Sequence, residues 1–163
     1  MSDSGANSAG EVNRPLGAYV TLMAAFVALV GGFAAWLRRS GHDLPKRPSA
    51  VDLVLVTVAT QKTSRLLSKE RITAPVRAPF TELEPDVGAD GPKETASGDG
   101  LRRALGELIG CPHCLSLWIA TAFTAGLIAA PRSTRWTVAG LAVVSGSDVL
   151  QIAYRRFQSS SDR

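Results

Sequence analysis

Both cysteines of the chain lie in one short motif, Cys111-Pro112-His113-Cys114. Two thiols three residues apart lie on one face of a helix, close enough to form a disulfide or to share a metal ion. A thiol at a helix N-terminus also has a lowered pKa, because unpaired backbone N–H groups stabilise the thiolate. The motif therefore offers redox chemistry, metal binding or plain packing, and the compartment that it faces bears on the choice.

Packing is the first interpretation of this motif, and metal binding is the second. A zinc site within one chain needs four ligands, and the sequence offers Cys111, Cys114, His113 and the distant His42. Two chains could instead supply four thiolates across the axis of a homodimer. We therefore expect either no cofactor or one zinc ion at a dimer interface.

Redox chemistry is the third interpretation, with Cys111 as the nucleophile. The Pro-His dipeptide between two cysteines is similar to that of thiol oxidoreductases of the thioredoxin superfamily, but no alternation of strands and helices surrounds it. In the cytoplasm the pair should rest as a dithiol. We expect Cys111 to react faster than Cys114, which lies one turn deeper in apolar surroundings. No catalytic residue is assigned, and the residues favour a protein that is not an enzyme.

Long apolar segments position this motif. Residues 16–37 and 111–130 contain no charged side chain, and residues 136–154 contain only Asp148. A helix of about 20 apolar residues matches the hydrocarbon core of a bilayer, which is about 30 Å thick. We predict an all-α integral membrane protein with three transmembrane helices.

A fourth, marginal helix is predicted over residues 50–67, where apolar residues recur with helical spacing until Lys62 interrupts them. It either crosses the bilayer with Lys62 snorkelling to the surface or lies in the interface. The predicted organisation is a disordered tail over 1–14, an N-terminal transmembrane helix over 15–39, a membrane domain over 50–157 with a polar loop at about 68–110, and a short tail over 158–163.

The Lys and Arg residues give the orientation, because they are enriched on the cytoplasmic side of membrane proteins. If residues 50–67 lie in the interface, the N-terminus is outside and 15 of the 18 basic residues are cytoplasmic. If they span the membrane, the N-terminus is inside and 12 of the 18 basic residues are cytoplasmic. We favour the first topology. Both place the 68–110 loop and the C-terminus in the cytoplasm, so reporter fusions at Thr95 and Arg163 should report that compartment. The net charge of +4 therefore indicates the lipid bilayer as partner and not nucleic acid.

Asp148 is the only acid within a strongly apolar segment, about 10 Å inside the predicted cytoplasmic boundary. A lone acid there costs about 2–3 kcal/mol, so we expect a partner. Lys62 and Arg65 are the candidates, and we predict the pair Asp148–Arg65. A snorkelling or protonated carboxyl is the alternative.

Residues 77–80 place Arg77 and Phe80 in a bent, extended segment near the predicted membrane surface. We interpret this segment as an anchor to lipid headgroups, with a docking site for another protein as the alternative.

From about residue 53 to residue 154 the chain resembles an uncharacterised family of small bacterial membrane proteins, known only as a domain of unknown function. The matching pieces are Ser64-Arg65-Leu66-Leu67, Ile72-Thr73, Arg77-Ala78-Pro79-Phe80, Gly106-Glu107-Leu108, and Cys111-Pro112-His113-Cys114 followed by Trp118. The resemblance implies an inner-membrane protein whose 50–67 helix is membrane-embedded, and it implies no activity. The predicted role is packing or interaction, as a homodimer or with another membrane protein.

Overall fold

The structure, a computed structural model, describes residues 16–41, 49–88 and 91–161. The predicted tail over 1–14 and the position of His42 lie outside these residues. The elements in chain order are α1 (Leu16–Ser40), α2 (Ala50–Lys69), a short 3-10 helix (Arg71–Thr73), α3 (Ala74–Arg77), β1 (Thr81–Gly88), β2 (Gly91–Ala96), α4 (Gly100–Gly110), α5 (Pro112–Ala129) and α6 (Pro131–Ser161).

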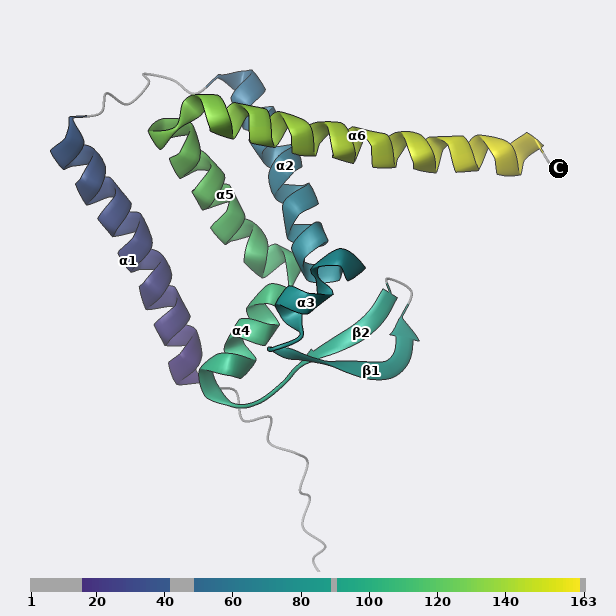
Figure 1. Cartoon of the computed structure of the whole chain (residues 1–163), viewed down its shortest axis with the longest axis horizontal. Helices are drawn as coiled ribbons and strands as arrows, with labels where there is room; N and C mark the ends of the chain where they lie inside the picture. The colour runs from purple at the N-terminus through teal and green to yellow at the C-terminus, as the bar shows by residue number, and fades with distance from the viewer. Residues whose placement is uncertain (1–15, 42–48, 89–90, 162–163) are drawn as a thin grey trace, which may run out of the picture.

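The centre of the molecule is α2, although its apolar pattern is the weakest of the long helices. α5 packs along α2, and α6 crosses it and continues beyond it (Figure 1). The buried core joins Val56 and Ala59 of α2 to Val138 of α6. Four partly buried side chains pack around them: Leu55, Phe123, Leu127 and Leu141.

α1 joins the rest of the molecule through its first half. The Tyr19 hydroxyl donates to the Glu107 carboxylate of α4, and the ring of Phe26 meets Trp118 of α5 edge to face, with centroids 5.1 Å apart. The beginning of α1 therefore lies at the same end of the molecule as α4 and the end of α2 (Figure 1). α2 runs back toward this end of the molecule (Figure 1), and the choice between a spanning and an interfacial helix over 50–67 stays a prediction.

β1 and β2 form an antiparallel hairpin in which Thr81 pairs with Ala96 and Gly88 pairs with Gly91. The all-α prediction is therefore incomplete, although the described part of the chain is mostly helical. A two-stranded hairpin is marginal by itself. This one is held by tertiary contacts with α4 and by a hydrogen bond from the Ser97 N–H to the Phe80 carbonyl.

Three described helices are long and apolar enough to cross a membrane: α1, α5 and α6. They correspond to the three strongly apolar segments of the sequence. α6 continues past the apolar segment and past Arg155 and Arg156 to Ser161, because no glycine or proline interrupts it there.

The first testable prediction concerns Gly106, where α4 touches the hairpin. A Cβ added there would lie 2.4 Å from the Phe80 carbonyl oxygen and 3.0 Å from the Ala96 Cβ. Gly106→Ala should therefore destabilise the protein by about 1–3 kcal/mol through overpacking, even though alanine favours helix. The midpoint of thermal unfolding of the purified full chain measures the loss.

Gly110→Ala is the matched control, because Gly110 also lies in α4 and nothing stands within 4 Å of its added Cβ. That variant should unfold at the wild-type midpoint or above it. Equal effects of the two substitutions would contradict the close packing of α4 against the hairpin.

Candidate functional site

Arg77 forms the most extensive polar cluster in the described structure. Its side chain is 2% exposed, and its Nε and Nη2 donate to the two carboxylate oxygens of Glu94, both at 2.7 Å. Its Nη1 donates to the Leu67 carbonyl at 2.9 Å, the Glu70 carbonyl at 3.0 Å and the Thr73 hydroxyl at 2.7 Å. The guanidinium thus closes the C-terminal end of α2 and holds β2 against it.

The prediction of a lipid anchor at residues 77–80 is wrong for Arg77. Its guanidinium is buried and turned toward Glu94, and the turns around Pro79 lead the chain into the hairpin. A bidentate pair with a carboxylate satisfies the planar guanidinium better than a headgroup at the surface, because the remaining N–H groups also find backbone carbonyls.

The cysteine motif forms the junction between α4 and α5. α4 ends at Gly110, Pro112 begins α5, and Cys111 is the N-cap, with its sulfur accepting the Cys114 N–H at 3.3 Å. The two sulfurs lie 2.8 Å apart as free thiols, and the Cys114 thiol donates to Cys111. The expected placement of the motif at a helix start is therefore observed.

The pKa of Cys111 lies below its ordinary value, chiefly because the Cys114 thiol donates to its sulfur. The backbone N–H groups of Cys114 and His113 and the charge of Lys69 act in the same direction, while burial opposes them. The two cysteines also differ in exposure: Cys114 is exposed, whereas Cys111 is half-buried. Acidity favours reaction at Cys111, and the slower reaction of Cys114 stays a prediction.

Of the three predicted metal ligands, the two cysteines lie together and His113 lies apart from them. His113 lines the groove between α2 and α5, whereas Cys114 faces the cavity that Tyr19 and Trp118 line on the α1 side. Among the described residues no group of three or more His, Cys, Asp or Glu side chains is placed to hold a metal ion. A zinc ion shared between two chains stays a prediction.

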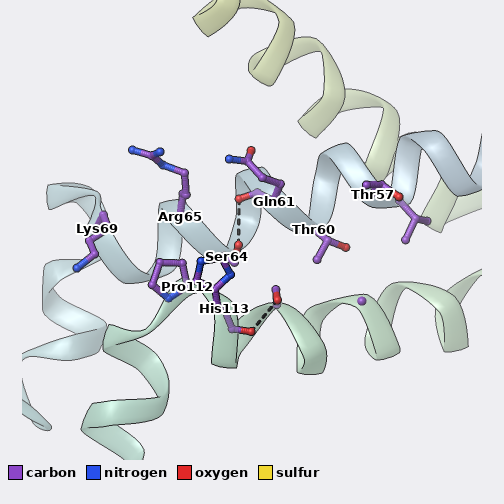
Figure 2. A pocket seen from close by; sticks show the side chains of 11 residues that line it. Thr57, Thr60, Gln61, Ser64, Arg65, Lys69, Pro112 and His113 are labelled. Carbon is purple, nitrogen blue, oxygen red and sulfur yellow. Dashed lines mark hydrogen bonds between the residues drawn. The ribbon is translucent and has the colours of Figure 1, made fainter. Parts of the chain in front are cut away.

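Arg65 lies in the groove between α2 and α5, which encloses about 550 Å³. Figure 2 shows Arg65 and Lys69 toward the end of the groove marked by Pro112 and His113. The remaining lining residues come from the two helices: Val56, Thr57, Thr60, Gln61, Ser64, Ser116 and Ala120.

Asp148 has a partner, but it is Lys62 and not Arg65. The Lys62 ammonium lies 2.6 Å from the Asp148 carboxylate. Lys62 faces α6, whereas Arg65 lines the groove between α2 and α5. The predicted pair Asp148–Arg65 is therefore wrong.

A second ion pair between the same helices was missed. Arg135 of α6 donates to both carboxylate oxygens of Asp52 in α2, at 2.9 and 2.8 Å. The sequence contains a signal for it, because Asp52 is a lone acid near the start of an apolar segment. Trp118, singled out beside the cysteine motif, packs α5 against α1 through Phe26.

Comparison with known proteins adds a family. The family model described as "Protein of unknown function (DUF1360)" matches residues 55–154. Sporulation protein YjcA of Bacillus subtilis (strain 168) is 29% identical over 106 residues, which cover 63% of this chain and 90% of the relative. No solved structure matches. The matched range contains the Arg77 cluster and the cysteine motif and leaves α1 outside.

The second testable prediction concerns Glu94. Glu94→Gln leaves the buried Arg77 guanidinium without its countercharge and should cost about 3–5 kcal/mol of unfolding free energy. The exposed Glu82→Gln, on β1 of the same hairpin, should change stability by no more than about 0.5 kcal/mol. Chemical denaturation of both variants at neutral pH measures their free energies of unfolding. Equal losses of stability in the two variants would show that the Arg77–Glu94 ion pair does not stabilise the fold.

The pH dependence has a definite sign. Hydrogen bonds from Arg77 hold the pKa of Glu94 below its ordinary value of 4.5. The pair therefore stabilises the folded chain above about pH 4.5, and this contribution is lost as the pH falls through the lowered pKa. Glu94→Gln should make stability less dependent on pH in this acidic range.

The third testable prediction is a double-mutant cycle between α2 and α6. Asp148→Asn and Lys62→Gln should be non-additive by about 0.5–3 kcal/mol, because the two groups are in contact. Asp148→Asn with Arg65→Gln should be additive within about 0.5 kcal/mol. Coupling to Arg65 and none to Lys62 would reverse this assignment.

Proposed function

We propose that this chain, which belongs to the DUF1360 family of proteins of unknown function, is a multi-pass membrane protein without catalytic activity. The observation that carries the proposal is the surface of α1. None of its residues is buried, and large apolar side chains such as Leu16, Val20 and Met23 are 66–68% exposed. A helix that is apolar on every side, and that protein covers on one side only, is suited to contact with lipid.

The ion pairs of α2 support a crossing helix. Twenty helical residues are about 30 Å long, the thickness of the hydrocarbon core. Asp52 and Lys62 lower the hydropathy of α2, but each is paired with a residue of α6, which reduces the cost of placing it inside a bilayer. We propose that α2 crosses the inner membrane and that residues 68–110 lie in the cytoplasm.

α6 exceeds the thickness of a bilayer. Its 31 residues are about 46 Å long, so it tilts or leaves the hydrocarbon core before Ser161. Its last turns contain Arg155 and Arg156, which suit the cytoplasmic headgroup region.

The cysteine motif has a structural role in this proposal. Cys111 uses its sulfur as an N-cap, a position that serine also fills well and alanine does not. The second candidate is a thiol redox protein that uses Cys111 and Cys114, which the short sulfur–sulfur contact and the lowered pKa of Cys111 favour. A zinc ion held across a homodimer is a further expectation.

The name of the relative supports a biological setting. Because YjcA is named a sporulation protein, we propose that this chain acts in the same process in its own host, in contact with itself or another membrane protein. Loss of spore formation on deletion, restored by the wild-type copy, is the expected result. Normal sporulation of the deletion strain would contradict it.

The fourth testable prediction separates the roles of the motif. If Cys111 is an N-cap, Cys111→Ser should preserve stability and Cys111→Ala should lose about 0.5–2 kcal/mol. Cys114→Ala, which removes the exposed thiol, is the matched control and should cost less. Thermal unfolding of membrane-extracted protein gives the comparison.

Thiol trapping and metal analysis of the same preparations complete the test. Free thiols in intact cells and no stoichiometric metal support the structural role. A trapped Cys111–Cys114 disulfide would favour the redox candidate, and about one zinc ion per dimer, lost in Cys111→Ser, would favour the metal site. Release of the chain from membranes by alkaline carbonate would contradict the membrane assignment itself.

A further inference from the structure

The groove between α2 and α5 changes character along its length. Arg65 and Lys69 lie toward the end at which α5 begins, and Val56 and Ala120 line the groove further along the two helices. Figure 2 shows this order along α2, with Thr60 directed toward α5 between the two ends. A cationic end followed by hydroxyls and then by apolar side chains is the pattern of polarity in an anionic amphiphile.

The cationic end of the groove has no close ion pair in the described chain, although Lys69 lies near enough to Glu94 to help lower the pKa of that carboxyl. Arg65 and Lys69 lie four residues apart on α2, and Figure 2 shows their side chains leaving the helix in different directions. Neither forms an ion pair with a described carboxylate, whereas Lys62 and Asp52 of the same helix both do. The groove itself has no acidic side chain among its lining residues. An anion at this end of the groove would be attracted by both cations.

Thr60 is an independent sign of a missing ligand. The residue is 8% exposed, it lines the groove, and its hydroxyl oxygen is buried without a hydrogen-bond partner. A buried hydroxyl without a partner destabilises the folded chain, because it has lost its hydrogen bond to water. The neighbouring hydroxyls of Ser64 and Ser116 already donate to backbone carbonyls, so Thr60 is the one that lacks a partner here.

We propose that this groove binds an anionic phospholipid. Its phosphate lies between Arg65 and Lys69, the ester region lies near Thr60, and one acyl chain runs between Val56 and Ala120. Two cations at a membrane surface attract anionic headgroups, and about 550 Å³ is enough for a headgroup and the start of a chain. The inference rests on the proposed membrane location, in which the cationic end lies at the cytoplasmic surface.

The test uses the full chain in a neutral detergent and short-chain phosphatidylglycerol as the ligand. Phosphatidylglycerol should raise the midpoint of thermal unfolding in a saturable way, while phosphatidylcholine of the same chain length and inorganic phosphate should raise it much less. An equal rise with inorganic phosphate would show a site for the free anion and overturn the lipid assignment. Equal rises with both lipids would show that the charge of the headgroup is not recognised, and no rise with any ligand would remove the site.

Variants locate the site. Arg65→Gln with Lys69→Gln should weaken phosphatidylglycerol binding at least about tenfold. Arg155→Gln with Arg156→Gln removes the same charge from exposed positions on α6 and should leave binding unchanged. Equal weakening in both double variants would indicate attraction to the whole basic surface and contradict the groove.

Ala120→Phe provides a test that keeps the charges. A phenyl ring at this position fills the apolar end of the groove, so it should weaken phosphatidylglycerol binding while the ion pairs of α2 stay in place. Unchanged binding would place the acyl chain elsewhere. Extraction with carbonate tests the membrane location separately, so a protein that stays in the membrane but binds no phosphatidylglycerol contradicts only this inference.

Discussion

The guanidinium of Arg77 is the contact on which the arrangement of the candidate site depends. The last carbonyls of a helix lack partners within it, and Arg77 supplies donors to two of them at the end of α2. The same group binds Glu94 through two hydrogen bonds, which fixes β2 beside α2. α4 packs on the hairpin at Gly106 and leads directly into the cysteine motif. One buried cation therefore links the end of α2 to the hairpin and, through α4, to the start of α5, while direct packing of α5 along α2 forms the groove between them.

Charge pairing also explains how α2 serves as the central helix. Its buried face contains Asp52, Thr60 and Ser64 beside Val56 and Ala59, so it is only partly apolar. Two ion pairs with α6 neutralise Asp52 and Lys62 and tie the two helices together over much of their contact. Arg65 and Lys69 have no such partner in the described chain, and they are the residues that we assign to an external anion. The helix thus distributes its charges between internal pairs and a ligand site.

The sequence was sufficient for features that depend on local pattern. The helices at 16–40, 112–129 and 131–161 follow from long apolar segments, and the helix start at the cysteine motif follows from Gly110 and Pro112. Features that depend on tertiary pairing were not predictable. Glu94 lies 17 residues after Arg77 within a polar segment, so nothing local indicates that the two meet or that a hairpin forms. The choice between Lys62 and Arg65 as the partner of Asp148 depends on which side of α2 faces α6, and their spacing alone does not determine it.

The central claim, that α2 crosses the membrane, is tested most directly by cysteine labelling in intact cells. In a chain with Cys111→Ser and Cys114→Ser, single cysteines are introduced at Ser49, just before α2, and at Thr95, in the hairpin, both exposed. A membrane-impermeant maleimide, applied under conditions that admit it to the periplasm, should label position 49 in intact cells and position 95 only after lysis. Protection of both positions until lysis would place them together in the cytoplasm and contradict a crossing α2.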